Sequence, residues 1–247
     1  MQDVSLKNTI YITDLLLKLM ARLCDETIRN RFLALYDLTR KMRACMDALI
    51  PLEKYDLLCV PTNLLYRCLI TDLMTSLLIS QIDDETFGKV MQIMEVDYTK
   101  SLVKSMDAEV LVKTSLSPDE KSAFEKYSLD YQTRHYDEFA ECLSSQKGEA
   151  WIAKQKEPKL INGIKFNGTI DQMYKVLLTF DEVKDIAYIY KFYKVFSQSE
   201  HFSLKNRVFI YKQDFHDTYY NQTRGLLYLG EELIYNKYRN SHNIPLS

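Results

Sequence analysis

The stretch Pro61–Gln81, PTNLLYRCLITDLMTSLLISQ, constrains the fold of this chain most, because it is apolar around nearly its whole circumference and yet carries an arginine. A helix that is apolar on nearly every side is enclosed by other helices. Its polar residues follow one another at i+4 and form a single stripe: Asn63, Arg67, Thr71 and Thr75. Asp72 lies roughly 140° around the axis from Arg67. Another segment must therefore supply an acceptor for the guanidinium, since a buried charge without a partner is costly.

The composition predicts a helical protein. Six glycines and five prolines are few for 247 residues, so long uninterrupted elements are expected, and the apolar residues repeat with helical spacing. We expect an all-α fold, a single multi-helix bundle around a buried central helix. At most a small hairpin forms near 160–167, where Asn162-Gly163 stands between apolar residues. One helical domain should cover 1–240, followed by a frayed tail over 241–247.

The order of helices follows from start and stop signals along the chain. Pro51 ends the second helix. Ser117-Pro118 is a strong start signal for a later helix. We expect a first helix over about 6–23 and a second that follows it to about 49. Further helices are expected over about 61–81, 83–113, 117–143, a dozen residues after Thr169, 182–200 and 215–239. On the central helix, Leu65, Leu69 and Leu73 should be buried. The irregular connection 144–168 is interpreted as a crossover between two helical halves, with a lid over a pocket as the alternative.

Charge, cysteine usage and motifs exclude several functional classes. The net charge of −2 gives no general attraction to nucleic acid. Arg67, Asp72 and the hydroxyl residues argue against a membrane span in Pro61–Gln81, and the N-terminus does not resemble a signal peptide. Five scattered cysteines without a C-x-x-C pair are typical of reduced core cysteines in a cytoplasmic protein. No phosphate loop, nucleophile elbow or zinc motif is present, so we expect no cofactor and no metal.

A second group of polar residues lies on the segment AYIYKFYKVFSQSEHF. Tyr193, Ser197 and His201 recur at i, i+4 and i+8, and Glu200 flanks them. These side chains offer the acceptors that Arg67 lacks. The candidate polar cluster is therefore Arg67, Thr71, Tyr193, Ser197, Glu200 and His201. Tyr188, Phe192 and Phe196 form an apolar stripe on the opposite side. The cluster either fixes helix register or forms a site, and the first interpretation is preferred. No catalytic residue is assigned.

These two helices resemble a family of uncharacterised bacterial helical-bundle proteins. The resemblance rests on an R-x-x-x-[T/D/E] helix, here Arg67 to Asp72, and a Y-x-x-x-S-x-x-x-H helix, here Tyr193, Ser197 and His201. Asp72 fills the usual acidic position only approximately. The resemblance covers about forty residues, and it implies an intracellular α-helical domain without an established activity or ligand.

We expect a binding or assembly module with a partly polar interior. The sequence does not identify a partner, and it leaves a homo-oligomer open. The enzymatic alternative is a metal-independent ribonuclease of the HEPN type, which is also a helical bundle and would bind nucleic acid. Such enzymes use a closely spaced Arg…His motif. Here His201 precedes Arg207, and eight residues separate Arg207 from His216, so neither pair has the expected spacing.

Overall fold

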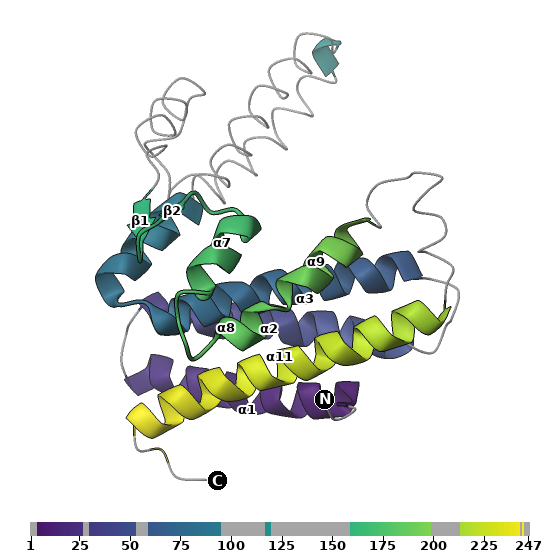
Figure 1. The fold of residues 1–247 in the computed structure, drawn as a ribbon, viewed down its shortest axis with the longest axis horizontal. Helices are drawn as coiled ribbons and strands as arrows, with labels where there is room; N and C mark the ends of the chain where they lie inside the picture. The colour runs from purple at the N-terminus through teal and green to yellow at the C-terminus, as the bar shows by residue number, and fades with distance from the viewer. Residues whose placement is uncertain are drawn as a thin grey trace. The chain divides into compact units, whose positions relative to one another are not determined.

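The computed structural model describes residues 4–26, 30–52, 59–94, 117–119, 159–198, 213–242 and 244. The chain divides into a larger unit, Met1–Phe87 with Thr169–Ser247, and a smaller unit, Gly88–Gly168. Regular structure in the described residues is almost entirely helical (Figure 1), which confirms the predicted all-α fold. That residues 1–240 form one domain stays a prediction.

Four long helices make the body of the larger unit and lie side by side in Figure 1. They are α1 (Leu6–Glu26), α2 (Asn30–Leu52), α3 (Cys59–Gln81) and α11 (Gln213–Ser241). α1 packs on α2, α2 on α3, α3 on α11, and α11 packs back on α1. The first three helices and the last one therefore close a ring, although more than 130 residues separate α3 from α11 in the sequence.

α3 is the central helix, as its sequence predicts. Besides α2 and α11, it contacts α7 (Ile170–Leu177) and α9 (Tyr190–Ser197). Every residue from 72 to 80 is buried, Leu73 included, and Leu69 is buried as well. The prediction that Leu65 is buried is wrong, because this side chain is only half-buried. The first half of α3 keeps an outward face, to which the exposed Cys68 also belongs, and only the second half is enclosed on all sides.

The hydroxyl groups of α3 enter the core because the helix backbone satisfies them. Thr71 donates a hydrogen bond of 3.0 Å to the carbonyl of Arg67, and Thr75 donates one of 2.8 Å to the carbonyl of Thr71. Ser76 bonds to its own helix in the same way. Such bonds to the preceding turn leave no buried hydroxyl without an acceptor. An otherwise apolar helix can therefore carry a polar stripe.

α11 approaches α3 closely at Gly230. A Cβ atom at this position would lie 2.8 Å from Cδ1 of Leu73 and 3.3 Å from Cγ2 of Ile186. Both distances are too short for ordinary packing of a methyl group. Glycine is therefore required here by the space between the helices.

The predicted helix 182–200 is interrupted. The structure has α8 (Lys184–Ala187), a turn at 188–189, and then α9. The interruption allows Ile186, Ile189 and Phe192 to be buried together, and this gain in burial outweighs the helix propensity of the segment. Phe196 is buried as predicted, but Tyr188 is 53% exposed and does not belong to the apolar stripe.

The predicted hairpin is present in the smaller unit. β1 (Lys159–Ile161) pairs antiparallel with β2 (Ile164–Phe166). Asn162 and Gly163 connect them with φ values of 47° and 77°, as a two-residue turn with two positive φ angles requires. Residues 84–94 are helical, and Asp83 caps them by accepting a hydrogen bond of 2.7 Å from the amide of Thr86. The remaining parts of the helices predicted over 83–113 and 117–143 lie outside the described residues, apart from 117–119.

Candidate functional site

Arg67 contacts Tyr193, which is one of the acceptors that the sequence offers on the later polar segment. Arg67, half-buried on α3, donates a hydrogen bond of 3.2 Å from Nη2 to the Tyr193 hydroxyl. The guanidinium also lies 5.2 Å from the centre of the Tyr193 ring. The same phenol therefore accepts a hydrogen bond and presents its π face to the cation, and both interactions stabilise the charge. An element more than a hundred residues away supplies the acceptor, as the sequence requires.

Tyr193 is one end of a stack of three tyrosines on α7 and α9. The ring centres of Tyr190 and Tyr193 are 6.2 Å apart, and those of Tyr174 and Tyr190 are 4.6 Å apart. The rings are nearly parallel, with interplanar angles of 12° and 13°. We call Tyr174, Tyr190 and Tyr193 the tyrosine stack. It joins α7 to α9 and ends on Arg67 of α3, so it fixes how three helices meet.

Asp171 pairs with Lys194 beside the stack. Its carboxylate accepts hydrogen bonds from the Tyr190 hydroxyl and from Lys194, the latter at 2.9 Å. These hydrogen bonds, the one from Tyr190 first and that from Lys194 next, hold the pKa of Asp171 below its ordinary value. Lys194 also lies 5.2 Å from the centre of the Tyr190 ring. Asp171, Tyr190 and Lys194 thus satisfy one another, which favours a structural role for the tyrosine stack over an open binding site.

Two further residues of the candidate cluster, Thr71 and Ser197, make hydrogen bonds to their own helices. Thr71 donates to the backbone of its own helix, and Ser197 donates a hydrogen bond of 2.9 Å to the carbonyl of Lys194. Glu200 and His201 lie outside the described residues, as does Arg207. The cluster as a functional site, and the ribonuclease alternative that needs His201, therefore stay predictions.

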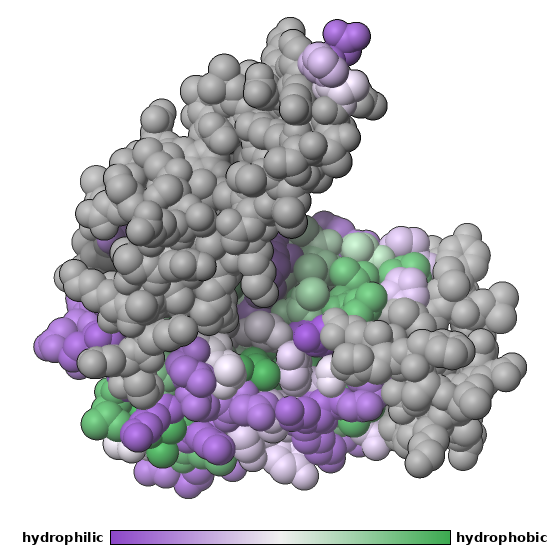
Figure 2. Space-filling model, turned by 90° about the horizontal axis from the view of Figure 1, so that it is seen from above, coloured by the Kyte–Doolittle hydropathy of each residue, from purple (hydrophilic) through white to green (hydrophobic). Residues whose placement is uncertain are grey.

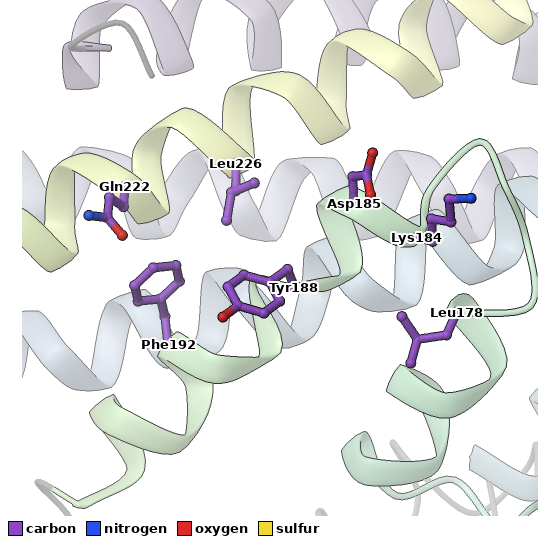
Figure 3. A pocket seen from close by; sticks show the side chains of 7 residues that line it. All are labelled: Leu178, Lys184, Asp185, Tyr188, Phe192, Gln222 and Leu226. Atoms are coloured by element: carbon purple, nitrogen blue, oxygen red, sulfur yellow. The ribbon is translucent and has the colours of Figure 1, made fainter.

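A groove that the sequence did not predict lies between α11 and the segment from the end of α7 to α9. It has a volume of about 580 Å³ and is lined by Leu178, Lys184, Asp185, Tyr188, Phe192, Gln222 and Leu226. Figure 3 shows Gln222 and Leu226 of α11 on one side, facing Phe192 and Tyr188 on the other. The lining is mainly apolar with a few polar groups, which is typical of ligand and peptide sites.

Two side chains of the groove are exposed although they are large and apolar. Leu178 is 44% exposed and Tyr188 is 53% exposed. Tyr188 stands in the turn between α8 and α9, so the interruption of the predicted helix is what moves it to the surface. Hydropathy along the sequence cannot show this, because a tyrosine between Ile186 and Phe192 fits a buried stripe equally well. Figure 2 shows that, on the face seen from above, apolar side chains also reach the surface among hydrophilic ones.

Among the described residues of the larger unit, two carboxyl groups are buried, and neither belongs to the predicted cluster. Asp72 is 3% exposed, and its carboxylate is 2.8 Å from Nζ of Lys41. Burial raises the pKa of Asp72, and the hydrogen bond from Lys41 offsets part of this effect. Asp72, which lies around the helix axis from Arg67, is thus paired with Lys41 across the α2–α3 interface.

The second buried carboxyl group is Glu231, which is fully buried between α1 and α11. Burial raises its pKa to about 8, so the group carries a proton at neutral pH. Its Oε2 lies 2.6 Å from Oγ1 of Thr13, which is itself 2.8 Å from the carbonyl of Thr9. A protonated carboxyl can donate to Thr13 and leave the threonine hydrogen for Thr9. The arrangement therefore suits a neutral acid, which is a structural role.

The described residues hold no group of three or more metal-binding side chains. Among these residues, none of the helices combines the length and apolar character needed to cross a membrane. Comparison of the chain with protein-family models, curated proteins and solved structures found no match. The helical character that the resemblance implied is shown by the structure, whereas the family itself stays a prediction.

Proposed function

We propose that this chain is a binding module, and that the groove between α11 and the α7–α9 segment receives the apolar face of a helix from a partner protein. The observation that carries the proposal is the exposure of Leu178 and Tyr188 at a groove whose floor is apolar. Large apolar side chains that stay exposed around a groove are typical of interaction sites, because association removes them from water. The apolar groups would supply the affinity, and Lys184 and Gln222 could orient the bound segment.

The shape of the apolar surface favours a helical partner. On α11, Leu226, Leu229 and Leu233 follow one another at helical spacing, and Leu229 is 42% exposed. The apolar surface therefore continues beyond the groove along the axis of α11. An elongated segment with apolar side chains at i, i+3, i+4 and i+7 matches such a strip, as in other helix-in-groove complexes.

An intracellular location and a relationship to bacterial helical-bundle proteins belong to the same proposal. Cys24, Cys45 and Cys68 are free thiols, which supports a reducing compartment. The relationship rests only on the Arg67 helix and the Tyr193–Ser197 helix.

Selection from a displayed library of helix-forming peptides tests the proposal. We expect the selected peptides to share apolar residues at i, i+3, i+4 and i+7. Tyr188→Ser should weaken their binding by about 1–2 kcal/mol, roughly 5- to 30-fold, measured by calorimetry. Leu33→Ser is the matched control, because Leu33 is also a large apolar side chain exposed at the surface, at 43%, but lies on α2 and does not line the groove.

Several outcomes would contradict the proposal. Selected peptides without an apolar face, or equal loss of binding in the Tyr188→Ser and Leu33→Ser variants, would exclude the groove as the site. Sedimentation velocity at rising protein concentration distinguishes a second copy of this chain as the occupant. In that case Tyr188→Ser would abolish self-association, and the added peptide would compete with it.

A further inference from the structure

Two ion pairs define how α2 and α3 run past each other. Arg31 at the start of α2 pairs with Asp84 just beyond α3 at 3.0 Å, and Lys41 pairs with Asp72 at 2.8 Å. The contacts therefore move backwards along α3 as they advance along α2, so the helices are antiparallel. Positions that lie one turn after Lys41 and one turn before Asp72 must face each other across the interface.

Those two positions are cysteines. Cys45 comes four residues after Lys41, and Cys68 comes four residues before Asp72. The charge of each thiolate acts on Lys41, and Cys68 also acts on Cys45, so the three groups lie within electrostatic range of one another. Burial raises the pKa of the Cys45 thiol, and the neighbouring Cys68 raises it further. Two thiols and an ammonium group thus share one edge of the α2–α3 interface.

This edge is open to solvent. Cys68 is exposed and Cys45 is half-buried. The side chain of Lys41 is 60% exposed. A small oxidant can therefore reach Cys68, while Cys45 remains beside it on the inner side. For Cys45, burial raises the pKa of the thiol and the ammonium group of Lys41 offsets part of this effect.

We propose that Cys45 and Cys68 are a redox pair, which a hydroperoxide oxidises to a disulfide joining α2 to α3. The Cys68 thiolate attacks the peroxide, so that an S–O bond forms, the O–O bond breaks, and the leaving oxygen takes a proton. Cys45 then attacks the sulfur of the sulfenic acid, so that the S–S bond forms and the S–O bond breaks, releasing water. Two thiols and hydrogen peroxide give one disulfide and two molecules of water.

The geometry of packed helices permits this bond. Axes of packed helices lie about 8–10 Å apart, and a disulfide needs Cβ atoms about 3.5–4.5 Å apart. Side chains at facing positions can bridge this interface with a small local adjustment. Cys68 lies on the first half of α3, outside the fully buried residues 72–80.

Peptide mapping of the intact protein tests the proposal. The chain is reduced, treated with hydrogen peroxide, blocked with an alkylating reagent and digested with trypsin. The five cysteines fall in five different tryptic peptides, which are 23–29, 44–54, 55–67, 68–89 and 135–147. We expect a linked species of 44–54 with 68–89 that disappears on reduction. The thiols of Cys45 and Cys68 should be lost together, before that of Cys24.

The matched variants are Cys68→Ser, which should abolish the linked species, and Cys24→Ser, which should leave it unchanged. Helical dichroism of both variants verifies that they fold. Oxidation of Cys68 to a sulfinic acid without a linked peptide would overturn the proposal. Linkage of Cys45 to Cys59 as often as to Cys68 would also overturn it, because proximity in the sequence and not in the fold would then govern the reaction.

Discussion

At the scale of single residues, the protonation state of each buried ionisable group depends on the partner that the fold gives it. Asp72 keeps a cation at 2.8 Å, Arg67 has a phenol, and Glu231 has a hydroxyl group. Burying an ion without such a partner is far more costly than burying a neutral group. Among the described carboxyl groups, Glu231 is accordingly the one whose pKa is raised to about 8 in the folded chain.

Glu231→Gln should remove a pH dependence of stability. The pKa of Glu231 rises from an ordinary value of 4.5 to about 8 in the folded chain. Between these values the unfolded chain releases the proton and the folded chain keeps it. The free energy of unfolding should therefore fall with rising pH, by about 1.4 kcal/mol per unit. Urea midpoints from pH 5 to 8 measure this slope, which Glu231→Gln should flatten and Glu232→Gln, at a half-buried neighbouring position, should not.

Substitution of Arg67 separates a structural role of its contact from a functional one. If the contact with Tyr193 only fixes the packing of α3 against α9, Arg67→Met should destabilise the chain less than Arg67→Ala. Methionine replaces the volume of the arginine stem without its charge, whereas alanine leaves a cavity. Denaturant midpoints give the comparison. Equal loss of stability in the two variants would show that the charge, and not the volume, matters.

At the scale of elements, the closeness of α11 and α3 depends on Gly230. Gly230→Ala should destabilise the protein although alanine is the better helix former. The new methyl group would lie 2.8 Å from Cδ1 of Leu73, which is fully buried among other core side chains. Overpacking costs about 1–3 kcal/mol, which exceeds the gain of about 1 kcal/mol in helix propensity.

Gly88→Ala is the control for this prediction. Gly88 lies within the helical residues 84–94, and a Cβ atom there would meet nothing within 4 Å. Only the propensity term then applies, so the substitution should stabilise the chain. Thermal unfolding midpoints that shift in the same direction for both variants would contradict the close approach of α11 to α3.

At the scale of the whole molecule, α11 completes a ring that the first three helices leave open. Removal of residues 213–247 should expose the faces of α1 and α3 that α11 covers. The loss of helical dichroism should then exceed the share of the chain that is removed, and unfolding in urea should lose its cooperativity. Removal of 242–247 alone should change neither property. A truncated chain that keeps helical α1, α2 and α3 would show that these helices are stable without α11.

The sequence by itself determined the local elements. The spacing of apolar residues defines α1, α2, α3 and α11, and Asn162-Gly163 defines the hairpin turn, because these signals act between residues a few positions apart. It also indicated that Arg67 needs a partner, and the Tyr193 segment was identified correctly because it carried the acceptors. Each of these inferences uses chemistry that is visible within one segment.

Only the tertiary structure decided the rest. The turn at 188–189 arises because Ile186, Ile189 and Phe192 are buried together, and it moves Tyr188 to the groove. The pairing of Lys41 with Asp72 and the facing of Cys45 and Cys68 depend on the register between two helices. The high pKa of Glu231 depends on how completely α1 and α11 exclude water. Burial and register are properties of contacts between distant segments, and the periodicity of a single helix does not contain them.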